Sequence, residues 1–246
     1  MLLNKIIKNI NPAYKSIKFN NIRFNSKNCK PNDIFFAIKG NNSNGNYFIK
    51  KAIRNGSKII ISNLNFEGFN KEKILFIKSK NPRKTLAEAA SNFYIKKPKN
   101  IIAITGTNGK TSIANFFYQI LSLNKKKVAT IGTLGVLSKR IKFKTSNTTI
   151  DSIKIHQILQ KLKNLKIDNV IVEASSHGLK QYRLDEINFK TALFTNLTRD
   201  HLDYHKTFKD YLSSKLILFD RLLVNKGNII FENGIPQEKE LKKISK

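Results

Sequence analysis

A short apolar run, a turn bounded by glycines and an amphipathic segment follow one another between residues 100 and 123. This succession constrains the fold more than any other feature. Ile101–Ile104 is apolar throughout, as in a buried strand. Gly106–Gly109 interrupts the run, and from Lys110 apolar residues recur with helical spacing. We expect one helical face to be formed by Ile113, Phe116, Phe117, Ile120 and Leu121. A strand, a glycine turn and a helix in this order predict a phosphate cradle, because the turn N–H groups and the helix dipole attract anions.

The turn matches the nucleotide-binding P-loop pattern in part. Its residues are Gly106, Thr107, Asn108, Gly109, Lys110, Thr111 and Ser112. The general pattern has a further glycine upstream, in the region where this chain has Ile104 and Thr105. In a nucleotide site Lys110 would give a charge to the β- and γ-phosphates, and Thr111 a hydroxyl to Mg²⁺. A Gly-Lys-Thr turn alone also fits an ordinary loop, but the flanking strand and helix favour nucleotide binding.

The chain is strongly basic, with a formal net charge of +30 over 246 residues. Such a charge is typical of proteins that bind nucleic acid or anionic membranes. Here the lysines are spread along the whole chain and form no block or stripe, and the bias toward Lys, Asn and Ile is what an AT-rich genome would produce. We therefore expect neither a nucleic-acid partner nor a membrane partner, although the basic surface would help to hold anionic substrates.

Cysteine usage and the N-terminus predict a cytoplasmic protein. Cys29 is the only cysteine, so the sequence encodes no intrachain disulfide and no cysteine-based metal site. The first residues, MLLNKIIKNINP, have neither the apolar core nor the cleavage site of a signal peptide. No apolar run approaches the roughly 20 residues that a bilayer-spanning helix needs.

Two compositional units are predicted. Residues 1–97 form a small mixed α/β domain, with strands expected at Ser16–Phe24, Asp33–Ile38, Lys58–Ile61 and Ile74–Ile77. A helix is expected to begin after an Asn81 N-cap with Pro82 in its first turn. Residues 98–246 alternate strands and helices, which predicts a P-loop-type parallel sheet that is covered on both faces and incomplete. The predicted fold class is therefore α/β.

Three polar clusters follow predicted strands: Gly106–Thr111, Glu173–His177 and Thr195–His205. Ligands of parallel sheets bind at the carboxyl ends of strands, so we expect these clusters to lie together. Glu173 directly follows an apolar run and would hold Mg²⁺ through its carboxylate, although a solvated Glu at a loop entrance is the alternative. His201 would contact a cation or phosphate, or be structural. His156, on a predicted helix, is expected at the surface.

Lys215 lies within the apolar stripe of a predicted helix, four residues after Tyr211. A buried charged lysine is costly unless it is paired or neutral. Either its amine reaches water while its stem is buried, or its pKa is depressed and the amine is reactive. The spacing leaves both alternatives open.

Three segments resemble the Mur ligases, the ATP-dependent amide ligases of peptidoglycan synthesis. They are GTNGKTS (106–112), EASSHGL (173–179) and TNLTRDHLDYH (195–205). Their residues are most similar to those of the MurE group, which adds the third amino acid to UDP-N-acetylmuramoyl-L-alanyl-D-glutamate (UDP-MurNAc-L-Ala-D-Glu). Residues 24–40, FNSKNCKPNDIFFAIKG, agree with the N-terminal domain of that group. The resemblance covers essentially the whole chain.

The resemblance implies a reaction and its participants. ATP phosphorylates a carboxylate of the glutamate unit, and an amine attacks the resulting acyl phosphate. The implied catalytic residues are Lys110, Lys215, Glu173 and His201. Thr111 and Glu173 would hold one Mg²⁺, and Glu173, His201 and a carbamate formed from CO₂ on Lys215 would hold a second. The implied nucleotide-sugar contacts are Phe24, Ser26, Asn41, Asn42, Ser43, Asn147, Thr148, Thr149, Ser175, Gln181 and Arg183.

Two departures from the family pattern bear on function. Lys27 follows Ser26 where the family usually has arginine, which changes the geometry available to a planar anion. MurE proteins also have a C-terminal amino-acid-binding domain, and these 246 residues contain neither its counterpart nor the Asp-Asn-Pro-Arg signature of a diaminopimelate pocket. We expect a MurE-type ligase that uses diaminopimelate or lysine. The alternatives are a truncated protein or a split-enzyme piece that works with a separate C-terminal piece, and a non-catalytic binding protein.

Overall fold

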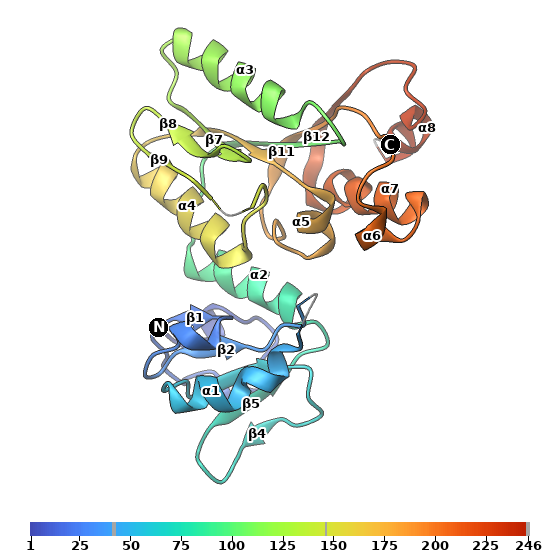
Figure 1. Ribbon diagram of the computed structural model, residues 1–246. Coiled ribbons are helices and arrows are strands. Elements are labelled where there is room, and N and C mark those ends of the chain that lie inside the picture. The colour runs from blue at the N-terminus through green and yellow to red at the C-terminus, as the bar shows by residue number, and fades with distance from the viewer. Residues whose placement is uncertain (41–42, 146, 245–246) are drawn as a thin grey trace. The chain divides into compact units, whose positions relative to one another are not determined.

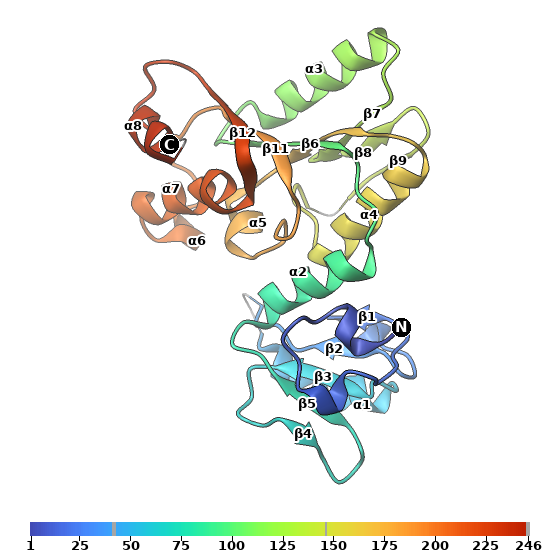
Figure 2. The ribbon, with the colours of Figure 1, turned by 180° about the vertical axis from the view of Figure 1, so that it is seen from behind.

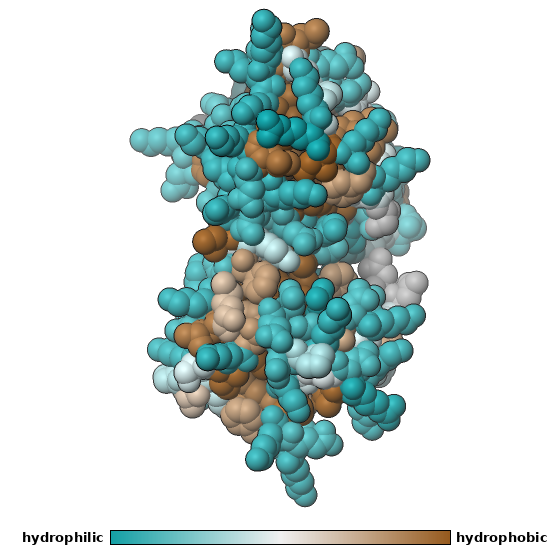
Figure 3. Space-filling model, turned by 90° about the vertical axis from the view of Figure 1, so that its left-hand side faces the viewer, coloured by the Kyte–Doolittle hydropathy of each residue, from teal (hydrophilic) through white to brown (hydrophobic). Residues whose placement is uncertain are grey.

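The computed structural model describes residues 1–40, 43–145 and 147–244 (Figure 1). The chain divides into two compact units, Met1–Ile95 and Lys96–Lys246. Among the described residues, no helix combines the length and the apolar character needed to cross a bilayer. Hydrophilic side chains cover most of the face seen in Figure 3, with apolar patches between them.

The first unit contains a mostly parallel sheet. Within the described residues its strand order is β1-β2-β3-β5-β4, and only the β4–β5 pair is antiparallel. The strands are β1 (Ile22–Arg23), β2 (Ile34–Phe36), β3 (Ile59–Ser62), β4 (Gly68–Phe69) and β5 (Leu75–Lys78). The long first strand expected at Ser16–Phe24 is wrong: only its end pairs with β2.

Two α-helices accompany this sheet, α1 (Ile49–Arg54) and α2 (Pro82–Phe93). Alternate strand residues point to opposite faces, and Phe35 and Ile60 pack on one face with Ile49 and Ala52 of α1. Helix α2 begins as predicted, because the Asn81 side chain accepts a hydrogen bond from the Lys84 N–H and Pro82 occupies the first turn. It contacts β2.

The second unit is built on a larger sheet with the order β12-β11-β6-β10-β7-β8-β9 in the described residues. The pairs from β12 to β7 are parallel, and β8 and β9 extend the edge as antiparallel strands. The strands are β6 (Asn100–Thr105), β7 (Val128–Gly132), β8 (Gly135–Ser138), β9 (Lys142–Phe143), β10 (Asn169–Glu173), β11 (Phe189–Phe194) and β12 (Leu223–Phe231). The predicted parallel P-loop-type sheet and the α/β class are confirmed.

Helices cover the two faces of this sheet unequally. The helices are α3 (Lys110–Leu123), α4 (Ser152–Asn164), α5 (Ser176–Lys180), α6 (Leu202–His205), α7 (Phe208–Ile217) and α8 (Glu238–Ile244), with a π-helical turn at Leu218–Leu222. Figures 1 and 2 show α3 on one face and α4, α5 and α7 on the other. The larger core lies on the α4 face and includes Ile155, Leu159 and Leu162.

The apolar face of α3 is less buried than the sequence predicts. Ala114 is buried and Ile113 and Phe117 pack partly against Ile104 and Ile171, but Phe116 and Ile120 are each 58% exposed. The helical spacing correctly located the helix, yet periodicity does not show how much of an apolar face is covered by other residues.

The surface position expected for His156 on α4 is wrong. Its side chain is fully buried, and its Nε2 lies 3.2 Å from the Asp185 carbonyl oxygen.

Candidate active site at the carboxyl ends of the strands

The glycine turn after β6 needs backbone conformations that only glycine adopts readily. Gly106 has φ 146° and Gly109 has φ 84°. A Cβ on Gly106 would lie 1.8 Å from Thr195 Oγ1. A larger residue would therefore displace Thr195, which directly follows β11. Gly109 caps α3, whose first residue is Lys110. The sequence therefore sets a tight turn at the amino terminus of a 14-residue helix.

Residues after β11 hold this turn in place. Thr195 Oγ1 donates to the Asn108 carbonyl oxygen at 2.6 Å. The Asn108 N–H donates to Asn196 Oδ1 at 3.0 Å, and the Thr107 N–H donates to the Asn196 carbonyl oxygen at 2.9 Å. The predicted clusters at Gly106–Thr111 and Thr195–His205 are thus in direct contact, as expected for neighbouring parallel strands β6 and β11.

Two lysines meet at one backbone oxygen of the turn. Lys110 Nζ donates to the carbonyl oxygens of Gly106 at 2.8 Å and Thr107 at 2.7 Å. Lys215 Nζ, from α7, donates to the same Gly106 oxygen at 2.7 Å. Lys215 is 1% exposed, and burial together with the nearby Lys110 charge lowers its pKa to about 7. Burial also lowers the pKa of Lys110.

The sequence left two interpretations of Lys215 open, an amine in water and a buried amine with a depressed pKa. The structure favours the second. Its amine does not reach water, as a lysine with only a buried stem would. Tyr211 contributes to this environment: Lys215 Nζ lies 4.4 Å from the centroid of its ring, and the Tyr211 hydroxyl lies 3.1 Å from Thr107 Oγ1. Around neutral pH a substantial fraction of the Lys215 amine is neutral and nucleophilic.

Glu173, at the end of β10, is 2% exposed and accepts three hydrogen bonds. Thr111 Oγ1 donates to Oε2 at 2.8 Å. Thr133 donates twice, through its N–H to Oε1 at 3.1 Å and through Oγ1 to Oε2 at 2.9 Å. Gly132 leaves room for this carboxylate, because a Cβ there would lie 2.1 Å from Glu173 Oε1. The structure thus joins the predicted pair Thr111 and Glu173.

Sequence reasoning missed Thr133. The signal was available, since Thr133 follows the strand Val128–Gly132, and this strand is parallel to β10 and ends at the same edge of the sheet. The oxygens of Thr111, Thr133 and Glu173 are hard donors of the kind that Mg²⁺ prefers. No cluster of three or more His, Cys, Asp or Glu side chains suited to a metal is found among the described residues. The donor set therefore fits a cation that is also bound by substrate phosphates and water.

His201 is the N-cap of α6 with φ 52°, and its ring contacts other aromatic rings. Its ring centroid is 4.9 Å from that of His177 and 6.2 Å from that of Tyr211. Its Nε2 is 3.5 Å from Asp200 Oδ2. His205 is fully buried, with Nε2 2.9 Å from Ser176 Oγ, and burial lowers its pKa to about 4. His205 is therefore neutral at pH 7, which suits a structural role.

A second polar network connects most of the predicted sugar-nucleotide contacts of this unit. Thr149 Oγ1 donates to the Glu173 carbonyl oxygen and accepts from the Ser175 N–H, both at 2.9 Å. Arg183 donates through Nη1 to the Thr149 carbonyl oxygen at 2.6 Å and through Nη2 to Gln181 Oε1 at 2.7 Å. The network also reaches Thr148, whose Oγ1 lies 3.0 Å from Thr133 Oγ1. Asn147 lies outside these bonds, and its carbonyl oxygen accepts from Thr145 Oγ1 at 3.1 Å. Ser112 is exposed on α3.

Two of the predicted contacts of the first unit, Phe24 and Ser26, follow the carboxyl end of β1. Phe24 directly follows this strand and is half-buried, and Ser26 is buried in a short 3₁₀ turn. The Ser26 carbonyl oxygen accepts from Asn55 Nδ2 at 2.8 Å. Ser43 is exposed, and its carbonyl oxygen accepts from the Gly40 N–H. Asn41 and Asn42 lie outside the described residues.

Models of known protein families match both units. Residues 104–246 match the model of the Mur ligase middle domain, and residues 18–94 match that of the Mur ligase family catalytic domain. The chain is 40% identical over 233 residues to UDP-N-acetylmuramoyl-L-alanyl-D-glutamate--2,6-diaminopimelate ligase of Rickettsia montanensis, and 42% identical to that of Clostridium tetani. Each match covers 93% of this chain and 48% of the relative.

Solved structures agree at the level of the fold. A structure of UDP-N-acetylmuramoyl-L-alanyl-D-glutamate--2,6-diaminopimelate ligase superimposes with a TM-score of 0.81 and 25% identity, covering all of this chain and 50% of the other. MurF from Thermotoga maritima, solved with ADP, has a TM-score of 0.56 and 21% identity, covering 91% of this chain and 48% of the other. The chain thus spans about half the length of the relatives it matches.

Proposed function

Because the chain belongs to the Mur ligase family, we propose that it binds ATP and a UDP-sugar dipeptide as part of a MurE-type amide ligase. The observation that supports this most strongly is the grouping at the carboxyl ends of β6, β7 and β10. There a glycine turn, a lysine and a hydroxyl–carboxylate set lie around one point. This is the arrangement that a magnesium–triphosphate complex requires.

The proposed ATP contacts are the turn and the first residues of α3. Backbone N–H groups of Gly106–Gly109 and the amino end of α3 would face the phosphates. Lys110 would turn from the two carbonyl oxygens that it now contacts toward the γ-phosphate, where charge accumulates in the transition state. Ser112 would add a hydroxyl at the helix terminus.

Mg²⁺ fits the oxygen donors of Thr111 and Glu173, with Thr133 keeping the carboxylate in place. When bound, the cation supplies charge neutralisation for the phosphates. The side chains of this chain orient it: Thr133 gives Glu173 two hydrogen bonds, so the carboxylate presents a defined face toward Thr111. Loss of either hydroxyl would leave the carboxylate less well oriented.

The proposed reaction joins a carboxylate to an amine in two steps. A carboxylate oxygen of the glutamyl unit attacks the γ-phosphorus, the bond to the bridging oxygen breaks, and ADP leaves. The amine nitrogen of the amino acid then attacks the acyl carbon, phosphate leaves and the nitrogen loses a proton. Lys110 would stabilise the transferring phosphoryl group, and the turn N–H groups would hold its oxygens.

Lys215 is proposed to carry a carbamate. The neutral amine attacks CO₂, an N–C bond forms and the nitrogen releases a proton, so that a neutral group becomes an anion. The geometry gives a reason for this change, because the amines of Lys110 and Lys215 donate to the same oxygen and the charge of Lys110 repels a charged Lys215. A carbamate would replace that repulsion by attraction and would provide, with Glu173 and His201, oxygen and nitrogen donors for a second Mg²⁺.

The nucleotide-sugar dipeptide is proposed to contact both units. In the second unit Asn147, Thr148, Thr149, Ser175, Gln181 and Arg183 would bind it; in the first, Phe24, Ser26 and Ser43, together with Asn41 and Asn42. Arg183 supports this role, because burial lowers its pKa and its hydrogen bonds go to a neutral amide and a carbonyl group. The charge of Asp151 opposes this shift in part, which leaves the guanidinium open to further compensation. A phosphate or carboxylate of the substrate would supply that compensation.

A second candidate function follows from the length comparison. The relatives are about twice as long as the segment they share with this chain, and the incoming amino acid would be bound by residues of their other half. Under this proposal the chain binds ATP and the UDP-sugar dipeptide, and ligates only with a polypeptide equivalent to that half. Diaminopimelate is the proposed amino acid, because the relatives are named for it.

The test is phosphate release from ATP with Mg²⁺, bicarbonate, UDP-MurNAc-L-Ala-D-Glu and either diaminopimelate or lysine. Product formation by the chain alone supports the complete ligase. Binding without product, followed by product when the second half of the Clostridium tetani ligase is added, supports the split arrangement. Absence of binding to both ATP and the UDP-sugar dipeptide contradicts both.

A further inference from the structure

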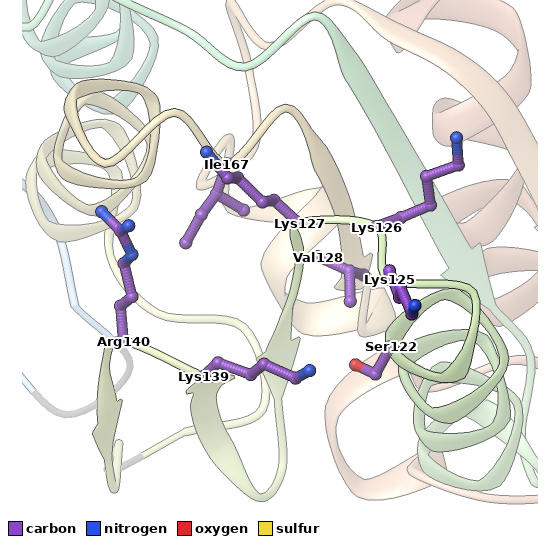
Figure 4. Close-up of a pocket in the computed structure, with 8 residues that line it drawn as sticks. All are labelled: Ser122, Lys125, Lys126, Lys127, Val128, Lys139, Arg140 and Ile167. Carbon is purple, nitrogen blue, oxygen red and sulfur yellow. The ribbon is translucent and has the colours of Figure 1, made fainter.

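A basic cavity lies at the opposite edge of the second unit's sheet, at the amino end of β7. Its volume is about 180 Å³, and five cationic side chains line it: Lys125, Lys126, Lys127, Lys139 and Arg140. They come from the turn that connects α3 to β7 and from the turn that connects β8 to β9. Figure 4 shows Lys139 extending toward Ser122, whose hydroxyl faces it, while Lys126 extends away.

The charge around this cavity is uncompensated by its own lining. No acidic residue is among the side chains that line it in the described part of the chain. Two unit charges 4 Å apart interact with about 1 kcal/mol in water and about 4 kcal/mol near a protein surface. An anion between several cations would replace repulsion by attraction. The carboxyl end of α3 contributes only about half a negative charge, which is much less than the cations provide.

Ser122 supplies an independent observation. Ser122 is among the residues that line the cavity, and its buried hydroxyl has no hydrogen-bond partner among the described residues. An unpaired buried hydroxyl costs about 1–3 kcal/mol, so such groups normally have a partner. An anionic oxygen would accept a hydrogen bond from it. A water molecule would satisfy the hydroxyl too, but it would leave the cations uncompensated.

The remaining walls define the size and kind of the ligand. Val128 and Ile167 are buried apolar residues that line the cavity beside the cations. The volume is below the roughly 300–1,000 Å³ of pockets for drug-sized ligands. A whole nucleotide therefore exceeds it, whereas a phosphate, a pyrophosphate or a small phosphate ester fits.

We propose that this cavity is a second anion site, which binds a small phosphorylated molecule independently of the ATP site. Ser122 and Lys110 belong to the same helix, α3, and are about 18 Å apart along its axis. The cavity also lies at the amino ends of the strands, whereas the glycine turn lies at their carboxyl ends. Lys139 and Ser122 face each other across the cavity, and Lys127 lines it on the side of Ile167 (Figure 4).

The experiment uses the full chain with Lys110→Ala, so that the glycine turn does not compete for the probe. Inorganic phosphate, pyrophosphate and ribose 5-phosphate are titrated separately by calorimetry without Mg²⁺. Three versions are compared: this background, Lys127→Gln with Lys139→Gln, and Lys50→Gln with Lys51→Gln. The last pair lies exposed on α1 of the other unit and removes the same charge.

We expect saturable binding of one anion, weakened at least tenfold by the Lys127 and Lys139 changes and less than twofold by the control pair. Ser122→Ala should weaken binding severalfold without lowering the Tm of the free protein. Tighter binding of ribose 5-phosphate than of phosphate would identify an ester as the ligand. Equal weakening by both lysine pairs would show general attraction to a basic chain and would overturn the proposal, as would an unchanged affinity of Ser122→Ala together with unsaturable titrations.

Discussion

The two ends of the parallel strands in the second unit carry polar groups in opposite states. At the carboxyl ends polar side chains are bonded to one another, as the buried Glu173 carboxylate is to Thr111 and Thr133. At the amino ends exposed cations surround a cavity, and the Ser122 hydroxyl has no partner in the described residues. One end is held by its own hydrogen bonds, and the other is defined by charge and shape.

Because of this difference, we expect substitutions at the two ends to change stability and affinity differently. A preorganised site loses both orientation and stability when one of its groups is removed, because neighbouring buried groups lose their partners. A cavity lined by solvated lysines loses only affinity, because exposed side chains contribute little to the folded state.

Lys215→Met should change the pH dependence of stability most. The pKa of Lys215 is about 7 in the folded protein, below its ordinary 10.5. Between these values the unfolded chain binds a proton that the folded chain does not, so stability rises with pH. From pH 10 to pH 7 the free energy of unfolding of the unchanged protein should fall by roughly 3 kcal/mol more than that of the variant. Urea unfolding measures this, with Lys126→Met at the amino end as control. Parallel curves for the protein and Lys215→Met would contradict the burial argument.

Lys110→Ala should abolish most nucleotide affinity. Removing a partner of a buried charge pair costs about 2–5 kcal/mol, so we expect the Kd for ATP with Mg²⁺ to rise about 100-fold. Calorimetry measures the Kd. Lys127→Ala, which removes the same charge at the amino end, should change it less than twofold. If both variants weakened ATP binding equally, net charge rather than the glycine turn would explain it.

Glu173→Gln should remove the magnesium dependence of that affinity. The amide keeps the shape and most hydrogen bonds of the carboxylate but loses its charge, so ATP binding with Mg²⁺ should weaken about tenfold. Binding measured in EDTA should stay unchanged. An equal loss in both conditions would indicate that Glu173 supports the fold and not the cation.

The smallest changes in unfolding free energy are expected for Thr133→Val and Ser122→Ala, which compare the two ends directly. Thr133 Oγ1 donates to a buried carboxylate, so its loss should cost about 1 kcal/mol of unfolding free energy. Ser122 Oγ has no such partner, so its loss should cost nothing or stabilise slightly. Chemical denaturation of both variants in phosphate-free buffer tests the contrast. Similar losses at both sites would remove the distinction between the two ends.

The sequence predicted the elements of the site better than their surroundings. The turn at Gly106–Gly109 was predictable because glycine, apolar periodicity and strand length act locally. Thr133 was missed because its partner Glu173 is 40 residues away, and only the parallel pairing of β7 with β10 brings them together. The exposure of Phe116 and the burial of His156 were missed for the same reason: a helical pattern shows which residues share a face but not what packs on it.

The central claim is that the carboxyl ends of β6, β7 and β10 hold the phosphates of ATP and its cation. Amide hydrogen exchange with and without ATP and Mg²⁺ tests it directly, since it reports which backbone N–H groups become protected. We predict slower exchange at Gly106–Ser112 and at Thr133, and no change around Lys125–Val128. Unchanged exchange in the glycine turn at saturating ATP, with protection elsewhere, would contradict the claim.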